Sequence, residues 1–257
     1  MREKILSKLT EIEEKENVKI LYCAEAGSRA TGLSSEDSDY DVRFIYKRRL
    51  TDYLKLETVR DVIEWQCDDT LDISGWDIKK ALTLGYRSNP SLFEWMSSPI
   101  VYKEAEEWKS VRDALMGYFS PLHTAMHYFS MAKSNYDGTF GRENLKFKKY
   151  FYMLRPLLSA EWVTSRRELP PLVFGELVEA LPEGEVKSTV RELVTAKRNG
   201  SKKTEGKPIA ILNQYVEDGL VRLDAAIRSL PEEERRDIKP LDDVFLSLLY
   251  TTSHVDE

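Results

Sequence analysis

Residues 26–44 read AGSRATGLSSEDSDYDVRF, in which a Gly-Ser pair is followed, after ten residues, by two aspartates two positions apart. Apolar stretches flank this segment, VKILYCAE at 18–25 and VRFIYK at 42–47, and both are rich in the β-branched and aromatic residues typical of strands. If the second stretch is a strand, Asp39 and Asp41 project from one face at its start and Tyr40 from the other.

Two carboxylates held side by side repel one another, which raises at least one pKa unless a cation neutralises them. The cation that suits clustered carboxylates is a hard divalent ion such as Mg²⁺. The spacing of Asp39 and Asp41 therefore predicts a metal site made of oxygen ligands.

A third acid is expected on a neighbouring strand, and Asp72 fits best because Leu71 and Ile73 alternate with it. Its nearby competitors are Asp68, Asp69 and Asp77. The first two fall in a predicted turn, and the last fits the N-cap of a following helix.

The Gly-Ser pair predicts a phosphate-binding turn. Gly27 and Ser28 end a strand and open a short helical turn, so that backbone N–H groups and the Ser28 hydroxyl face a common point. Phosphate donors beside metal-binding carboxylates suit displacement at a nucleoside triphosphate. Each pattern alone is weak, and SSEDSDYD could be a solvated acidic turn, but the conjunction of strand, GS, DxD and strand favours catalysis.

These residues resemble the polymerase-β-like nucleotidyltransferase superfamily, which has a helix-opening GS, a DxD or DxE on the next strand and a third carboxylate on a later one. More narrowly, residues 25–46, 72–82, 88–102 and 145–162 are similar to bacterial and phage predicted nucleotidyltransferases, a group that includes RNA-ligase-associated proteins of RNA repair. The resemblance extends from about Tyr22 to Trp162. One departure is Ala26, where that group often has serine.

The resemblance implies that Gly27 and Ser28 are the family's GS and that the metal acids are Asp39, Asp41 and Asp72. It implies a Mg²⁺-dependent enzyme, with Mn²⁺ as the alternative ion. Such an enzyme transfers a nucleoside monophosphate from a nucleoside triphosphate to an acceptor hydroxyl and releases pyrophosphate.

The periodicity of apolar residues divides the chain into two parts. An amphipathic helix at 2–17 and strands near 60–67 and 71–76 complete an N-terminal part with a mixed sheet, and helical spacing prevails from Asp77 onward. The expected helices cover about 104–117, 121–136, 143–160, 184–198, 207–229 and 239–250. We therefore expect an α+β fold, with a polymerase-β-like nucleotidyltransferase domain at 1–103 and a helical nucleotide- or substrate-binding domain at 104–257.

Basic side chains outside the acid cluster are candidates for nucleotide binding. Lys148, Tyr152 and Arg155 share one face of a predicted helix, where they could contact the triphosphate and stack on a base or ribose. The alternative is an amphipathic helix whose aromatic residues are core. Arg29 follows the GS turn and is a further nucleotide ligand, and Arg43 either pairs with a catalytic acid or touches phosphate.

The acceptor stays open at this stage. The resemblance suggests an RNA end, whereas a formal charge of −6, from 38 basic and 44 acidic residues without a long basic block, suits a small molecule or a protein hydroxyl. A non-catalytic nucleotide sensor is the alternative from another class. An RNA acceptor predicts that six lysines gather beside the acids, namely Lys146, Lys148, Lys149, Lys202, Lys203 and Lys207; the loop at 197–208 is either a solvated connector or a basic arm.

The remaining features indicate a cytoplasmic protein without a membrane partner, because the sequence has no signal peptide and no long apolar run. Its two cysteines, Cys23 and Cys67, are expected to be reduced thiols. His123 and His127 share a helix face, and a structural or surface role is favoured over metal binding. The five tryptophans are expected to pack in cores rather than to serve as base platforms.

Overall fold

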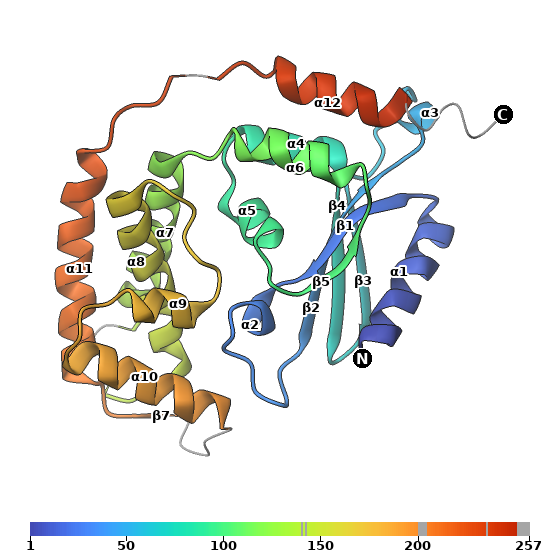
Figure 1. Ribbon diagram of the computed structural model, residues 1–257. Helices are drawn as coiled ribbons and strands as arrows, with labels where there is room; N and C mark the ends of the chain where they lie inside the picture. The colour runs from blue at the N-terminus through green and yellow to red at the C-terminus, as the bar shows by residue number, and fades with distance from the viewer. Residues whose placement is uncertain (140, 142, 200–204, 235, 251–257) are drawn as a thin grey trace. The chain divides into compact units, whose positions relative to one another are not determined.

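The computed structural model describes residues 1–139, 141, 143–199, 205–234 and 236–250, with the backbone alone at Cys67. The chain forms two compact units (Figure 1). The first comprises Met1–Ala30, Asp39–Phe119 and the described residues of Arg235–Glu257, and the second comprises Thr31–Ser38 and Ser120–Glu234.

The first unit is built on a five-stranded sheet in the order β3-β4-β2-β1-β5. The strands are β1 (Lys19–Glu25), β2 (Tyr40–Lys47), β3 (Val62–Asp68), β4 (Leu71–Asp77) and β5 (Val101–Glu104). β2 and β4 are parallel, and the other neighbours are antiparallel. The sheet is therefore mixed, as expected for the α+β class.

One face of this sheet is covered by α1 (Arg2–Glu16) (Figure 1). Ile5, Leu9 and Ile12 lie on one stripe of the helix at helical spacing, and all three are buried. They pack with the strand residues that alternate inward, including Phe44 and Ile73. The amphipathic pattern at the N-terminus was therefore interpreted correctly.

The other face carries α4 (Ile78–Tyr86), α5 (Pro90–Met96) and α6 (Trp108–Met116). Tyr22 of β1 stacks on Trp108 with ring centroids 5.0 Å apart, and Trp76 of β4 stacks on Trp95 at 3.8 Å. The tryptophans of this face pack in the core, as predicted. Large aromatic side chains supply much of the apolar area that this face buries.

The C-terminal helix α12 (Lys239–Tyr250) belongs to the first unit, where it contacts β2 and α3. The buried Lys47 ammonium donates to the carbonyl oxygen of Leu248 (2.9 Å), and Phe245 meets Tyr53 edge to face at 5.2 Å. Tyr53 ends the short helix α3 (Leu50–Tyr53). A charged side chain that is only 3% exposed needs such a partner, which fixes the end of α12 against β2.

Asp77 begins α4 as its N-cap, accepting the N–H of Lys79 (2.8 Å) and the O–H of Tyr53 (2.9 Å). This outcome confirms the cap that the sequence predicted. Burial raises the pKa of the Asp77 carboxyl above its ordinary value, although these two hydrogen bonds and the Arg48 charge act in the opposite direction; the Asp61 charge adds to the rise.

We expect Asp77→Asn to remove a pH-dependent term in stability. Because the folded pKa of Asp77 is raised, its contribution is complete below the unfolded pKa, about 4, and is lost as pH rises through the folded pKa. Asparagine keeps the cap without the charge. In urea unfolding, the stability of the variant relative to the native chain should be higher at pH 8 than at pH 4. The same difference in unfolding free energy at both pH values contradicts this account.

The second unit is a helical bundle. Its helices are α7 (Pro121–Asp137), α8 (Lys148–Arg166), α9 (Phe174–Glu179), α10 (Glu185–Arg198) and α11 (Ala210–Arg228), with a two-stranded sheet of β6 (Leu145–Lys146) and β7 (Glu205–Gly206). Gly219 of α11 lies against Leu157 of α8, where a Cβ would come within 3.0 Å. A residue without a side chain thus lets the two helices approach closely.

Several sequence predictions need correction. The boundary expected at 103/104 is wrong as a division of the structure, because α6 and α12 pack in the first unit. The strand β5 and the short helix α9 were both missed, since each is too short to show a period. The loop expected at 197–208 contains β7, while Lys202 and Lys203 lie outside the described residues.

The segment between the GS and DxD motifs packs in the second unit. Thr31 accepts the N–H of Phe174 at 2.9 Å, the Gly32 carbonyl accepts the Nε–H of Arg198 at 3.0 Å, and Leu33 lies in the helical core. The spacer also contains the acidic turn that its composition allowed, in which the Ser38 N–H donates to the Ser35 carbonyl oxygen (3.1 Å) and Glu36 and Asp37 are exposed. It is anchored at its first residues by apolar burial and two hydrogen bonds.

Candidate active site

Asp41 and Asp72 lie directly opposite one another on the parallel strands β2 and β4. The register follows from local sequence, because Leu71 and Ile73 are buried on one face of β4 while Asp72 between them points to the other. The side chains of Asp41 and Asp72 are 32% and 49% exposed. Two partly exposed carboxylates thus lie side by side near the start of two interior strands.

The Gly-Ser turn lies against Asp41. β1 ends at Glu25 and α2 (Gly27–Ala30) follows, as predicted, and the Ala26 N–H donates to the Asp41 carbonyl oxygen (2.7 Å). A Cβ on Gly27 would lie 1.9 Å from Asp41 Oδ2, and the φ of Gly27 is +56°. Only glycine fits here, for lack of space and because of the left-handed backbone.

Arg43 lies on the same face, two residues beyond Asp41. Its Nη2 donates to Asp72 Oδ2 at 2.7 Å and to Asp41 Oδ1 at 3.5 Å, while its Nη1 donates to the carbonyl oxygens of Val42 (3.0 Å) and Asp72 (3.4 Å). Of the two alternatives predicted for Arg43, the structure shows the pairing with acids, namely Asp41 and Asp72. An arginine therefore links the two acids.

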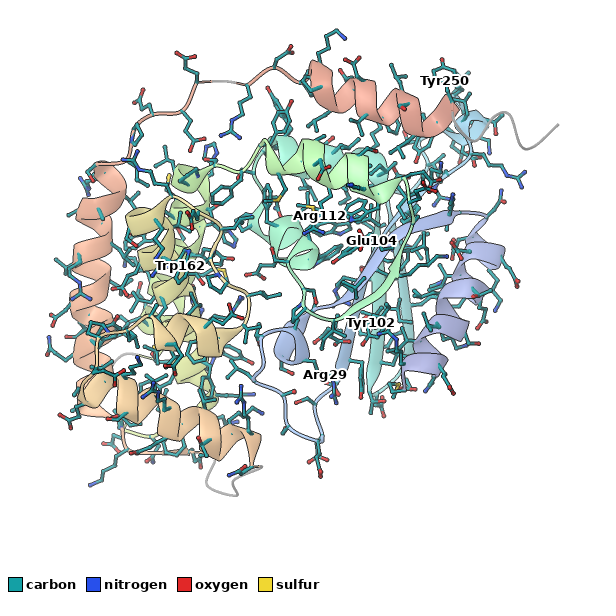
Figure 2. All side chains as sticks on the ribbon, viewed as in Figure 1. Arg29, Tyr102, Glu104, Arg112, Trp162 and Tyr250 are labelled. Carbon is teal, nitrogen blue, oxygen red and sulfur yellow. The ribbon has the colours of Figure 1, made fainter. Side chains whose placement is uncertain are left out.

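Glu25 is a buried acid that contacts the backbone of Asp41, and it was not identified from the sequence. Its buried carboxylate accepts the Asp41 N–H at 2.8 Å and the Tyr102 O–H (Figure 2). Burial raises the pKa of Glu25 above its ordinary value, while these two hydrogen bonds oppose the shift. An acid that ends an apolar strand directly before AGS was the available signal, but its partner lies on the unforeseen strand β5.

Asp39 and Arg29 complete the arrangement. Asp39 is exposed and comes directly before β2, and its carbonyl oxygen accepts the Nε–H of Arg29 at 3.2 Å. The Arg29 guanidinium lies 3.7 Å from the ring centroid of Tyr40. Tyr40 packs against the α1 side of the sheet, so it points away from Asp41 as the alternation predicted.

Two of the three competing acids, Asp68 and Asp77, have other structural partners. Asp68 pairs with Lys4 at 2.6 Å and accepts the N–H and O–H of Thr70, and these contacts hold the pKa of the Asp68 carboxyl well below its usual range. Asp77 caps α4. Asp72 is therefore the member of this set that lies opposite Asp41, in agreement with the sequence-based choice.

The three residues predicted to contact the nucleotide in the helical unit lie on α8. Lys148 opens the helix, Tyr152 is 51% exposed and Arg155 is half-buried, at spacings that put all three on one side. The Lys149 ammonium lies 5.8 Å from the centre of the Tyr152 ring. The core aromatics of this helix are Tyr150 and Phe151, so Tyr152 is not part of the helix's buried face.

The chemistry of the donors fits a hard divalent cation. Asp41 and Asp72 supply adjacent carboxylate oxygens, and Asp39 lies two residues before Asp41. Among the residues that the structure describes, no three histidine, cysteine, aspartate or glutamate side chains are gathered in metal-binding geometry. The structure instead shows the Arg43 guanidinium between the two carboxylates.

The chain is similar to several known proteins. Residues 1–247 match the family described as "RNA repair pathway DNA polymerase beta family". The sequence is 40% identical over 240 residues, 91% of each chain, to the uncharacterized protein YcgL of Bacillus subtilis (strain 168). A nucleotidyltransferase-like protein from Exiguobacterium sibiricum 255-15 matches at 13% identity, with 100% of this chain and 81% of that chain covered and a TM-score of 0.29.

Membrane-spanning helices were also considered. In the part of the chain that the structure describes, no helix combines the length and the apolar character needed to cross a bilayer.

Proposed function

Because the chain belongs to the RNA repair pathway DNA polymerase beta family, we propose that it transfers a nucleoside monophosphate from a nucleoside triphosphate to an acceptor hydroxyl, releasing pyrophosphate. The observation that carries the proposal is the pairing of Asp41 with Asp72 against the Gly27 turn. This pairing brings two carboxylates together at the start of β2 and β4, beside the turn whose N–H groups we propose to bind phosphate.

Each residue of the cluster has a role in this proposal. Asp39, Asp41 and Asp72 hold Mg²⁺, or Mn²⁺ in its place, which when bound neutralises charge on the reacting phosphate and activates the acceptor hydroxyl. Asp72 also serves as the general base for that hydroxyl. Ser28 and the backbone of its turn bind the terminal phosphates, and Arg29 adds a cation beside them.

The helical unit supplies further nucleotide contacts. The exposed Tyr152 ring offers a surface for a base or ribose, and Lys148 and Arg155 offer charge for the triphosphate. Pairing of β6 with β7 brings the segment of Lys146 close to that of Lys207. These basic residues suit a polyanionic acceptor, and the proposed acceptor is an RNA end in RNA repair within the cytoplasm.

The test is incubation of the purified protein with Mg²⁺ and each α-³²P-labelled nucleoside triphosphate, with and without total RNA. Label on RNA that disappears in Asp39→Ala supports the proposal and identifies the preferred base. Label only on protein or on a small molecule moves the acceptor to those classes. Nucleotide binding without any transfer supports a sensor and overturns the enzymatic proposal.

A further inference from the structure

Arg43 is the cation that the structure places on the two carboxylates. Its side chain is 19% exposed, against 32% for Asp41 and 49% for Asp72, so Arg43 is the most buried of the three charged groups. The guanidinium is positioned by four contacts, two to backbone carbonyls through Nη1 and two to carboxylates through Nη2. Nη1 therefore holds the side chain at the strand, and Nη2 neutralises the carboxylates.

A divalent ion shared by Asp41 and Asp72 competes with Nη2 for these two carboxylates, because each cation neutralises the same negative charges. Nη1 is held by the carbonyl oxygens of Val42 and Asp72, which a metal bound to carboxylates leaves in place. The arginine can therefore give up the acids while it stays at the strand.

From this geometry we infer that Arg43 is a positioning residue, a built-in counterion that holds Asp41 and Asp72 together until a divalent ion replaces it. On replacement, Nη2 turns to the triphosphate, the anion that arrives with the ion. This inference rests on the proposed function for its second step only, since the exchange of one cation for another needs no nucleotidyl transfer.

The experiment measures Mn²⁺ affinity of the nucleotide-free protein by electron paramagnetic resonance. R43M and R43Q remove the competing charge and should bind Mn²⁺ at least about tenfold more tightly than the native chain. R43K keeps the charge and should stay close to the native affinity. R60M is the matched control, because Arg60 pairs with Glu64 (2.7 Å) on the exposed edge of the same sheet and should leave the affinity unchanged.

Thermal unfolding supplies a second measurement. Without divalent ions R43M and R43Q should melt below the native protein, and Mg²⁺ should raise their melting temperatures by more than it raises the native one. With nucleotide present, both variants should lose turnover in spite of tighter metal binding.

Unchanged or weaker Mn²⁺ binding in both variants overturns the inference, and so does the absence of Mn²⁺ binding in every protein. If R43M and R43Q transfer nucleotide at the native rate and bind Mn²⁺ with unchanged affinity, the role inferred for Arg43 is ruled out and the proposed function stands. Tighter binding in a protein that transfers no nucleotide removes the proposed function and leaves the counterion role intact.

Discussion

Replacing Asp41 by asparagine should reduce nucleotidyl transfer by about 10³-fold or more while leaving the protein folded. A bound divalent ion supplies several kcal/mol of charge stabilisation in the transition state, and each 1.36 kcal/mol is tenfold in rate. Asparagine keeps the shape of Asp41 and an oxygen for Arg43, but it removes one of two adjacent carboxylates. Transfer rates and urea unfolding of the same preparations provide the two measurements.

The small effect on stability follows from two opposing changes. Loss of the Asp41 charge relieves repulsion from Asp72, yet it also removes one of the two carboxylates that Arg43 neutralises. Because these charges are partly exposed, each change is modest.

The matched control for Asp41→Asn is Asp68→Asn on the edge strand β3, which removes an acid paired with Lys4 and should keep full activity. Full activity in Asp41→Asn, or equal losses in both variants, rules out the assignment of Asp41 as a metal ligand.

Local patterns carried most of what the sequence could predict about the site. The DxD spacing put Tyr40 and Asp41 on opposite faces, and the Leu71–Ile73 alternation selected Asp72, since both depend only on the pleat of a single strand. The pairing of Asp41 with Asp72 depends on which strands are neighbours. The bridging position of Arg43 follows from that pairing and could be foreseen only as one of two alternatives.

The features that were missed depend on contacts between distant segments. β5 has four residues and forms by pairing with β1, so no period in its own sequence marks it. Glu25 gains its significance from Tyr102 on that strand. Likewise, the position of α12 in the first unit rests on Lys47 and Tyr53, about 200 residues earlier in the chain.

The spacer between the two motifs shows the same limit. Its polar composition indicated a solvated turn, which is present at Glu36 and Asp37, but it did not predict that Leu33 is buried in the helical core or that Thr31 accepts a hydrogen bond from α9. A short loop with a single large apolar residue carries little pattern of its own. The partners that bury it come from segments more than 100 residues away.

Gly27→Ala should reduce both the stability of the first unit and the transfer activity. Alanine in the left-handed conformation at φ +56° costs about 1–2 kcal/mol. In addition, its Cβ would lie 1.9 Å from Asp41 Oδ2, so the carboxylate must leave its position opposite Asp72. A displacement of about 1 Å at a reacting centre can cost 10²-fold in rate, and we expect at least that loss of transfer.

Gly32→Ala separates the two causes. Gly32 has a similar φ of +71°, but its Cβ would meet its nearest atoms, on Arg198 and Val173, at 3.4 Å, which those side chains can accommodate. Both variants should therefore lose about 1–2 kcal/mol in urea unfolding, and only Gly27→Ala should lose transfer activity. If the two variants lose activity equally, backbone strain around α2 explains the effect. The close approach of the turn to Asp41 then has no special part in catalysis, because Gly32 makes no such approach.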